Sequence, residues 1–170
     1  NTAIGYQAMH HAIPGGATPS FNVYIGYKAG FYMDDGASNT AIGHHAMLGN
    51  SSEANDGANN IAIGRSSLLS LTDGYQNVMV GDYTGDAITT GQNNTALGYA
   101  ALSAEDTGTR NVAIGNEALK VLNHDGAGYN VAVGHRAGFD LLTGTSNTLI
   151  GAFAGENITT GDSNTLIGKA

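Results

Sequence analysis

One short motif dominates this sequence: Asn-x-x-(Ile, Val or Leu)-Gly occurs ten times in 170 residues. Six of the nine intervals between successive motifs are 17 residues, two are 21 and one is 19. Such self-similarity is typical of solenoids, in which each repeat buries its apolar groups against its neighbours. We therefore expect the Asn and Gly of every motif to form structural ladders, with stacked Asn amides bonding to neighbouring repeats. The Asn positions are Asn1, Asn22, Asn39, Asn60, Asn77, Asn94, Asn111, Asn130, Asn147 and Asn164, and the Gly positions are Gly5, Gly26, Gly43, Gly64, Gly81, Gly98, Gly115, Gly134, Gly151 and Gly168.

Each motif predicts a short strand, because the residues between Asn and Gly are mostly β-branched or aliphatic. The first and third of these residues share one face and the second points to the other face. Both faces are largely apolar, so we expect the strand to be covered on both sides. The following segment, for example residues 65–72, places apolar groups at helical spacing and predicts a short helical turn. Asp-Gly or Thr-Gly pairs then return the chain to the next strand.

These features predict a mainly β fold, a β-roll-like solenoid with one strand per repeat of about 17 residues and short helical turns. Residues 1–170 read as a single array of about nine complete repeats and a partial tenth. The pattern is already running at residue 1 and still running at residue 170, and we expect the chain to be an excerpt of a longer fibre. The longer repeats carry extra residues at 10–21 and 49–59, which we expect to protrude as loops.

The charge of the chain limits its partners. Only six Lys and Arg stand against 14 Asp and Glu, which gives a formal net charge of -8. A basic footprint for nucleic acid is therefore lacking, and no apolar run reaches the roughly 20 residues that cross a bilayer. The chain has no Cys, so it offers neither disulfides nor thiolate chemistry.

The repeat resembles the head repeats of YadA-like trimeric autotransporter adhesins and related repeats of phage tail fibres and other surface fibres. The resemblance rests on residues 1–8, 39–46 and 94–101, which read NTAIGYQA, NTAIGHHA and NTALGYAA, and the repeat pattern covers the whole chain. It implies a left-handed β-roll, three chains in one fibre, and an adhesive role. The autotransporter repeat is usually shorter than 17 residues, so the roll geometry of that family does not carry over directly.

Four kinds of functional site have simpler explanations in this sequence. The pairs His10–His11 and His44–His45 lack the Cys or paired carboxylates that complete a metal site, so ordinary surface histidines explain them better. Aspartates such as Asp34 and Asp73 lie in turns, without a calcium-binding nonapeptide or EF-hand loop. Thr follows Asn in only half of the motifs, whereas an ice-binding face should keep Thr in every repeat. The six-residue apolar period of hexapeptide acyltransferases is absent.

We therefore expect a structural and adhesive segment of a cell-surface or virion fibre, extracellular and without catalysis, metal or cofactor. The expected partners are two further copies of the chain, in a homotrimer, and a glycan or protein receptor on a host surface, but neither nucleic acid nor a membrane. The alternative is a glycan-binding or glycan-processing module on a phage tail fibre. Residues that can contact a partner vary between repeats: they are Tyr6, Tyr27, Tyr99, His10 and His11.

Overall fold

The computed structural model describes residues 1–10, 19–51 and 55–169, and it is a parallel β-solenoid. Each repeat contributes one three-residue strand, and we call each repeat a rung, numbered by its strand. The strands are β1 (Thr2–Ile4), β2 (Val23–Ile25), β3 (Thr40–Ile42), β4 (Ile61–Ile63), β5 (Val78–Val80), β6 (Thr95–Leu97), β7 (Val112–Ile114), β8 (Val131–Val133), β9 (Thr148–Ile150) and β10 (Thr165–Ile167). The predicted solenoid with one strand per repeat is therefore confirmed.

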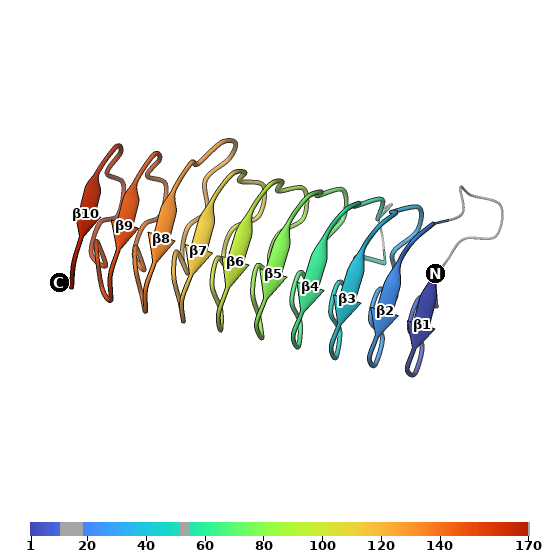
Figure 1. Ribbon diagram of the computed structural model, residues 1–170. Helices are drawn as coiled ribbons and strands as arrows, with labels where there is room; N and C mark the ends of the chain where they lie inside the picture. The colour runs from blue at the N-terminus through green and yellow to red at the C-terminus, as the bar shows by residue number, and fades with distance from the viewer. Residues whose placement is uncertain (11–18, 52–54, 170) are drawn as a thin grey trace.

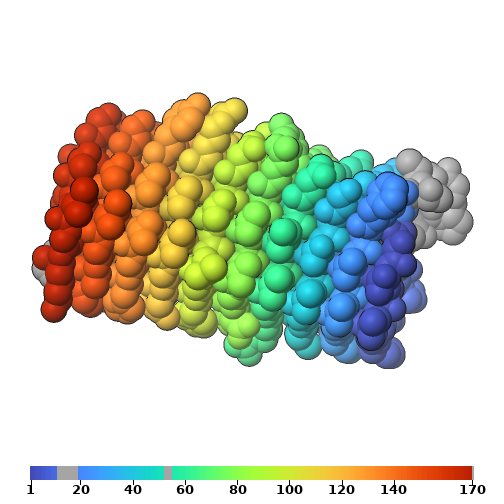
Figure 2. Space-filling model, in the orientation of Figure 1, coloured from blue at the N-terminus to red at the C-terminus, as the bar shows by residue number. Residues whose placement is uncertain are grey.

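All ten strands lie side by side in one sheet, in the order in which they occur in the chain (Figure 1). Equivalent motif positions pair across the sheet: Met79 of β5 lies opposite Ala96 of β6, for example. Nine spacings of about 4.8 Å give a sheet roughly 43 Å long. Figure 2 shows the rungs as successive bands along a rod, with the N-terminal and C-terminal rungs at opposite ends.

The core runs along the inside of the rod, and four positions of each rung contribute side chains to it. The middle strand residue points inward, as Ala62 and Met79 do, and both are fully buried. Three later positions complete the core: the small residue seven places after the Asn, the residue that follows it, and an apolar residue three places further on. In rung 4 these are Ser67, Leu68 and Leu71. A single thin core therefore extends through all rungs.

Two of these core positions exchange volume. Where the middle strand residue is large, the residue six places later is Gly, as in Tyr24 with Gly30 and Met79 with Gly85. A Cβ atom on Gly30 would lie 2.7 Å from ring carbons of Tyr24. Where the strand residue is Ala, the later residue is large in five rungs, as in Ala62 with Leu68. Rung 8 is the exception, with Ala132 and Gly138, and there Leu119 and Leu149 of the neighbouring rungs reach the space beside Gly138. In the other rungs the same space is filled from one position or the other.

The prediction of short helical turns was wrong for the described residues, which contain no helix. Residues six and eight places after the Asn adopt left-handed backbone conformations, with φ of 55° at Ser66 and 49° at Leu68. An α-helix cannot continue through such residues. Their amides bond across rungs instead: the N–H of Leu68 donates to the carbonyl of Thr84 at 3.1 Å. The apolar spacing that resembles a helix comes from two residues, Leu68 and Leu71, that enter the same core from a tight coil.

Candidate functional site

The Asn ladder lies buried at one corner of the rod. In rung 6 the Oδ1 atom of Asn94 accepts the backbone N–H of Asn111 at 3.0 Å. Its Nδ2 atom donates to the carbonyl of Gly108 at 2.8 Å. This pattern recurs along the rod, and each buried amide thus joins its own turn to the next rung. These side chains are fully engaged in the fold and offer nothing to a ligand.

The Gly that ends each strand allows adjacent rungs to approach closely. Gly98 has a φ of +133°, and a Cβ atom there would lie 2.4 Å from the carbonyl oxygen of Gly115. The column of these residues from Gly5 to Gly151 shows the same contact with the next rung. A side chain at this corner is incompatible with the stacking of the rungs.

The outer face of the sheet is apolar and unusually uniform. The first and third residues of each strand point away from the core and are half-buried or exposed. With two outward residues in each of ten strands, twenty side chains form this sheet face, and all are Thr, Val, Ile or Leu. Leu97 is 50% exposed, and Ile61, Ile63, Val78 and Ile150 are each exposed by more than a third. Extended apolar faces without charge are typical of interaction surfaces.

Next to the sheet face, the first three rungs carry a cluster of rings and one cation, which we call the aromatic patch. Its rings form a stack along the rod: Tyr6 lies 5.4 Å from Tyr27, and Tyr27 lies 5.0 Å from His44, between ring centroids. The ammonium group of Lys28 lies 5.6 Å from the ring of Tyr27 and 5.1 Å from that of Phe31. The patch consists of Tyr6, Tyr27, Lys28, Phe31, His44 and His45.

The structure brings some of the predicted contact residues together and separates others. Tyr6 and Tyr27 stack, and His10 stacks on Phe31 at 5.2 Å, at the border of the patch. Tyr99 occupies the same position as Tyr27 four rungs further on, where it contacts Tyr83 edge-on at 6.1 Å. His11 lies outside the described residues, as do residues 12–18 and 52–54 of the two predicted loops. The sequence analysis missed Lys28, although it adjoins Tyr27 in the chain.

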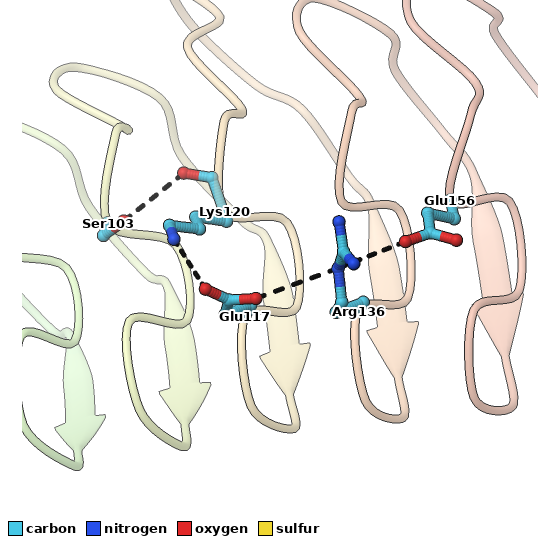
Figure 3. A network of polar contacts seen from close by, with 5 residues as sticks. All are labelled: Ser103, Glu117, Lys120, Arg136 and Glu156. Atoms are coloured by element: carbon cyan, nitrogen blue, oxygen red, sulfur yellow. Dashed lines mark hydrogen bonds and ion pairs between the residues drawn. The ribbon is translucent and has the colours of Figure 1, made fainter.

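Further along the rod, the corresponding surface carries a ladder of opposite charges (Figure 3). Glu117 contacts the ammonium group of Lys120 at 2.6 Å and the guanidinium group of Arg136 at 3.8 Å. Arg136 also lies 3.1 Å from Glu156 in the next rung. Contact with Lys120, chiefly a side-chain hydrogen bond, lowers the pKa of Glu117. These charges neutralise one another across three rungs and reinforce stacking.

Glu105 is a buried acid that the sequence analysis did not single out. It occupies the core position that holds Ile88 and Leu122 in the rungs on either side, and it is fully buried. Burial raises the pKa of its carboxyl group to about 7, although hydrogen bonds from backbone amides oppose this shift. The signal was visible in the sequence: Glu105 is the one charged residue in a column that is otherwise apolar except for Asn50.

The described part of the chain contains no group of three or more His, Asp or Glu side chains placed to hold a metal ion. Within the same residues, no helix has the length and apolar character needed to span a membrane. The sheet face and the aromatic patch are the two candidate surfaces that the described residues form.

Comparisons with protein-family models, with curated proteins and with solved structures each returned no match to this chain.

Proposed function

We propose that this chain is a structural and adhesive segment of a fibre on a cell surface or virion, assembled from three copies of the chain. The observation that carries the proposal is the charge-free sheet face, which extends along all ten strands. In water such a face favours burial by roughly 25 cal/mol for each Å² of apolar surface removed from solvent. A second copy of the chain has strands with the same spacing, so its sheet face can pack against this face rung for rung.

The remaining features of the rod suit a fibre better than an enzyme. Its rungs are held together by repeated backbone and Asn hydrogen bonds, which give length and rigidity. Three copies around one axis follow from the resemblance to trimeric adhesin heads, and closed symmetry is the usual outcome of association between identical chains. An extracellular fibre would present the surfaces away from the sheet face to its receptor.

The mass of the protein in solution tests this assembly. We expect light scattering at micromolar concentration to give three times the chain mass of 17.3 kDa. Replacing Val112 and Ile114 with Lys should produce monomers, because six like charges would meet at the centre of a trimer. Leu142→Lys is the control, since Leu142 is 49% exposed and lies outside the sheet.

A wild-type protein that stays monomeric at these concentrations would refute the assembly. So would a trimer that is unaffected by the two lysines on the sheet face. Attachment to the natural surface is tested separately, with the purified trimer as a competitor of the intact fibre. If the trimer does not reduce attachment at any concentration, the adhesive role is wrong even where the structural role holds.

A further inference from the structure

We propose that the aromatic patch binds an acidic saccharide, with Lys28 as the partner of its carboxylate and Tyr27 and Tyr6 as hydrogen-bond donors to its oxygens. The inference deepens the proposed adhesive role by naming the ligand class and the rungs that bind it. It rests on that role, but it does not require three chains, because every group involved belongs to one chain.

The charge distribution supports an anionic ligand. This surface of the rod is formed by the fifth, sixth and ninth residues after each Asn. In rungs 1–4, none of these residues is Asp or Glu. Acids first appear there at Asp82 in rung 5. This absence is notable in a chain with a net charge of -8. On this surface, an anion is therefore repelled least over rungs 1–4.

Lys28 is the cation of the aromatic patch. Within the described residues it shares with Arg110 and Lys169 the lack of a carboxylate partner, whereas Arg65, Lys120 and Arg136 each have one. Of the three cations without such a partner, Lys28 is the one that lies among several aromatic rings. Contacts with the rings of Tyr27 and Phe31 hold its ammonium group in place, which lowers the entropy lost on binding. The pKa of His45 is lowered by burial and then by the positive neighbours His44 and Lys28, so this corner lacks a compensating negative charge.

The ring geometry favours a saccharide over a single-stranded nucleic acid. Nucleobases bind by stacking on free aromatic faces. Both faces of Tyr27 are covered, one by Tyr6 and the other by His44, with interplanar angles of 11°. What the stack can offer a ligand is its rim of phenol hydroxyls and imidazole nitrogens, the donors and acceptors that suit sugar hydroxyls and carboxylates. Because these groups recur at about 4.8 Å along the rod, a linear polymer can contact several rungs at once.

The test compares two polymers of similar size by isothermal titration calorimetry: polygalacturonate, which carries one carboxylate per sugar, and dextran, which is neutral. We expect the protein to bind polygalacturonate and not dextran, and to lose this binding at about 1 M salt, where charges are screened within about 3 Å. Poly(dT) is the third arm and should bind at least about tenfold more weakly than polygalacturonate, a difference of about 1.4 kcal/mol in binding free energy.

Two variants locate the site. Lys28→Gln should weaken binding by about tenfold or more, the usual effect of losing a charge-assisted hydrogen bond. Tyr27→Phe should weaken it by a few fold while keeping the ring stack. Tyr99→Phe is the matched control, because Tyr99 occupies the same position of its rung outside the patch, and it should bind like the wild type. Equal thermal midpoints for the three variants would show that each remains folded.

The proposal is overturned if polygalacturonate fails to bind at low salt, if dextran or poly(dT) binds equally well, or if Lys28→Gln binds like the wild type. These failures are distinct from failure of the fibre proposal. A trimer that competes for the natural surface but ignores polygalacturonate would sink only the saccharide site. A monomer that binds polygalacturonate through Lys28 would sink only the assembly.

Discussion

The carboxylate of Glu105 accepts the backbone N–H of Gly108 at 2.8 Å, and it replaces a carbonyl group that the next rung fails to supply. In rungs 4 and 5, the amides twelve and fourteen places after the Asn share one carbonyl of the following rung. The amides of Thr72 and Gly74 both donate to the carbonyl of Thr89, for example. Rung 7 is two residues longer, and Oε1 of Glu105 receives the corresponding amides of Asp106 and Gly108. A buried acid thus repairs the hydrogen bonding beside an insertion.

Glu105 should make the stability of the rod depend on pH. Its pKa is raised from 4.5 to about 7 on folding, so the folded state favours the protonated carboxyl group. The stability that the protonated group contributes is therefore complete below pH 4.5 and is lost as the pH rises to about 7. The free energy of unfolding should fall by about 3 kcal/mol at most. Urea unfolding of the wild type and of Glu105→Gln between pH 4.5 and 8 tests this. The difference between their free energies of unfolding should change over this interval, because Gln does not titrate.

The matching substitution Glu105→Leu separates charge from hydrogen bonding. It places Leu where the adjacent rungs hold Ile88 and Leu122, but it leaves three amides, those of Asp106, Gly108 and His124, without this acceptor. It should therefore destabilise the rod at every pH. A pH-independent difference between the wild type and Glu105→Gln would show that the carboxyl group does not titrate in the folded rod.

Gly98 should tolerate no side chain. In Gly98→Ala the new Cβ atom would meet the carbonyl oxygen of Gly115 at 2.4 Å, and φ is +133°. Backbone strain alone costs about 1–3 kcal/mol, and the clash adds to it. The control is Gly126→Ala, where φ is +96° but nothing lies within 4 Å of the new atom. Thermal unfolding should show a much larger loss for Gly98→Ala, and equal losses would mean that conformation and not rung contact demands glycine.

The sequence predicts the periodic part of this fold well, because the same physical demand is repeated ten times. Asn at the corner, an inward residue in the strand and Gly at the bend are visible as columns of identical residues. The conformation between Gly98 and the next Asn was not predictable in the same way. Apolar residues at positions such as Leu68 and Leu71 have the spacing of a helix, and periodicity alone does not tell whether their amides bond within the segment or to the next rung.

The candidate sites show the same division. Register alone places Tyr6 above Tyr27, because both follow the Gly of the motif in adjacent rungs. It also places Tyr99 four rungs away from Tyr27, which weakens the idea of one continuous stripe. The position of Lys28 over two rings depends on the left-handed conformation of its backbone, with φ of 53°, which no local pattern indicated. The role of Glu105 depends on an insertion in the neighbouring rung.

The volume exchange between Met79 and Gly85 should appear as a large coupling. Met79→Ala leaves a cavity and should cost about 2–4 kcal/mol. Gly85→Leu overfills the rung, because even a Cβ atom would lie 3.0 Å from the sulfur of Met79. The double variant recreates the arrangement of Ala96 and Leu102 in the next rung, where Leu102 has φ of 56°, close to the 57° of Gly85. In urea unfolding, the double variant should be at least about 1 kcal/mol more stable than the sum of the two single changes predicts. If the losses of the two single variants simply add in the double variant, the two positions do not share one space.

Asn94 should be essential for joining rungs 6 and 7. Asn94→Ala removes the acceptor of the amide of Asn111 and the donor to the carbonyl of Gly108, and leaves both buried groups unpaired. The cost should be about 2–5 kcal/mol. Asn94→Asp keeps the acceptor but sets a carboxylate oxygen against the carbonyl of Gly108, so it should also destabilise the rod. Asn116→Ala is the control, because Asn116 is exposed at a position that varies between rungs.

Hydrogen exchange followed by mass spectrometry can localise the effect of Asn94→Ala. Peptides that include Asn111 should lose protection against exchange, because the backbone N–H of Asn111 has no other acceptor. Peptides from rungs 2 and 3 should stay protected. Nearest-neighbour coupling between rungs predicts this local opening before the whole rod unfolds. If the stability falls by no more than in Asn116→Ala and protection at Asn111 is unchanged, the ladder follows from the stacking of rungs and does not hold them together.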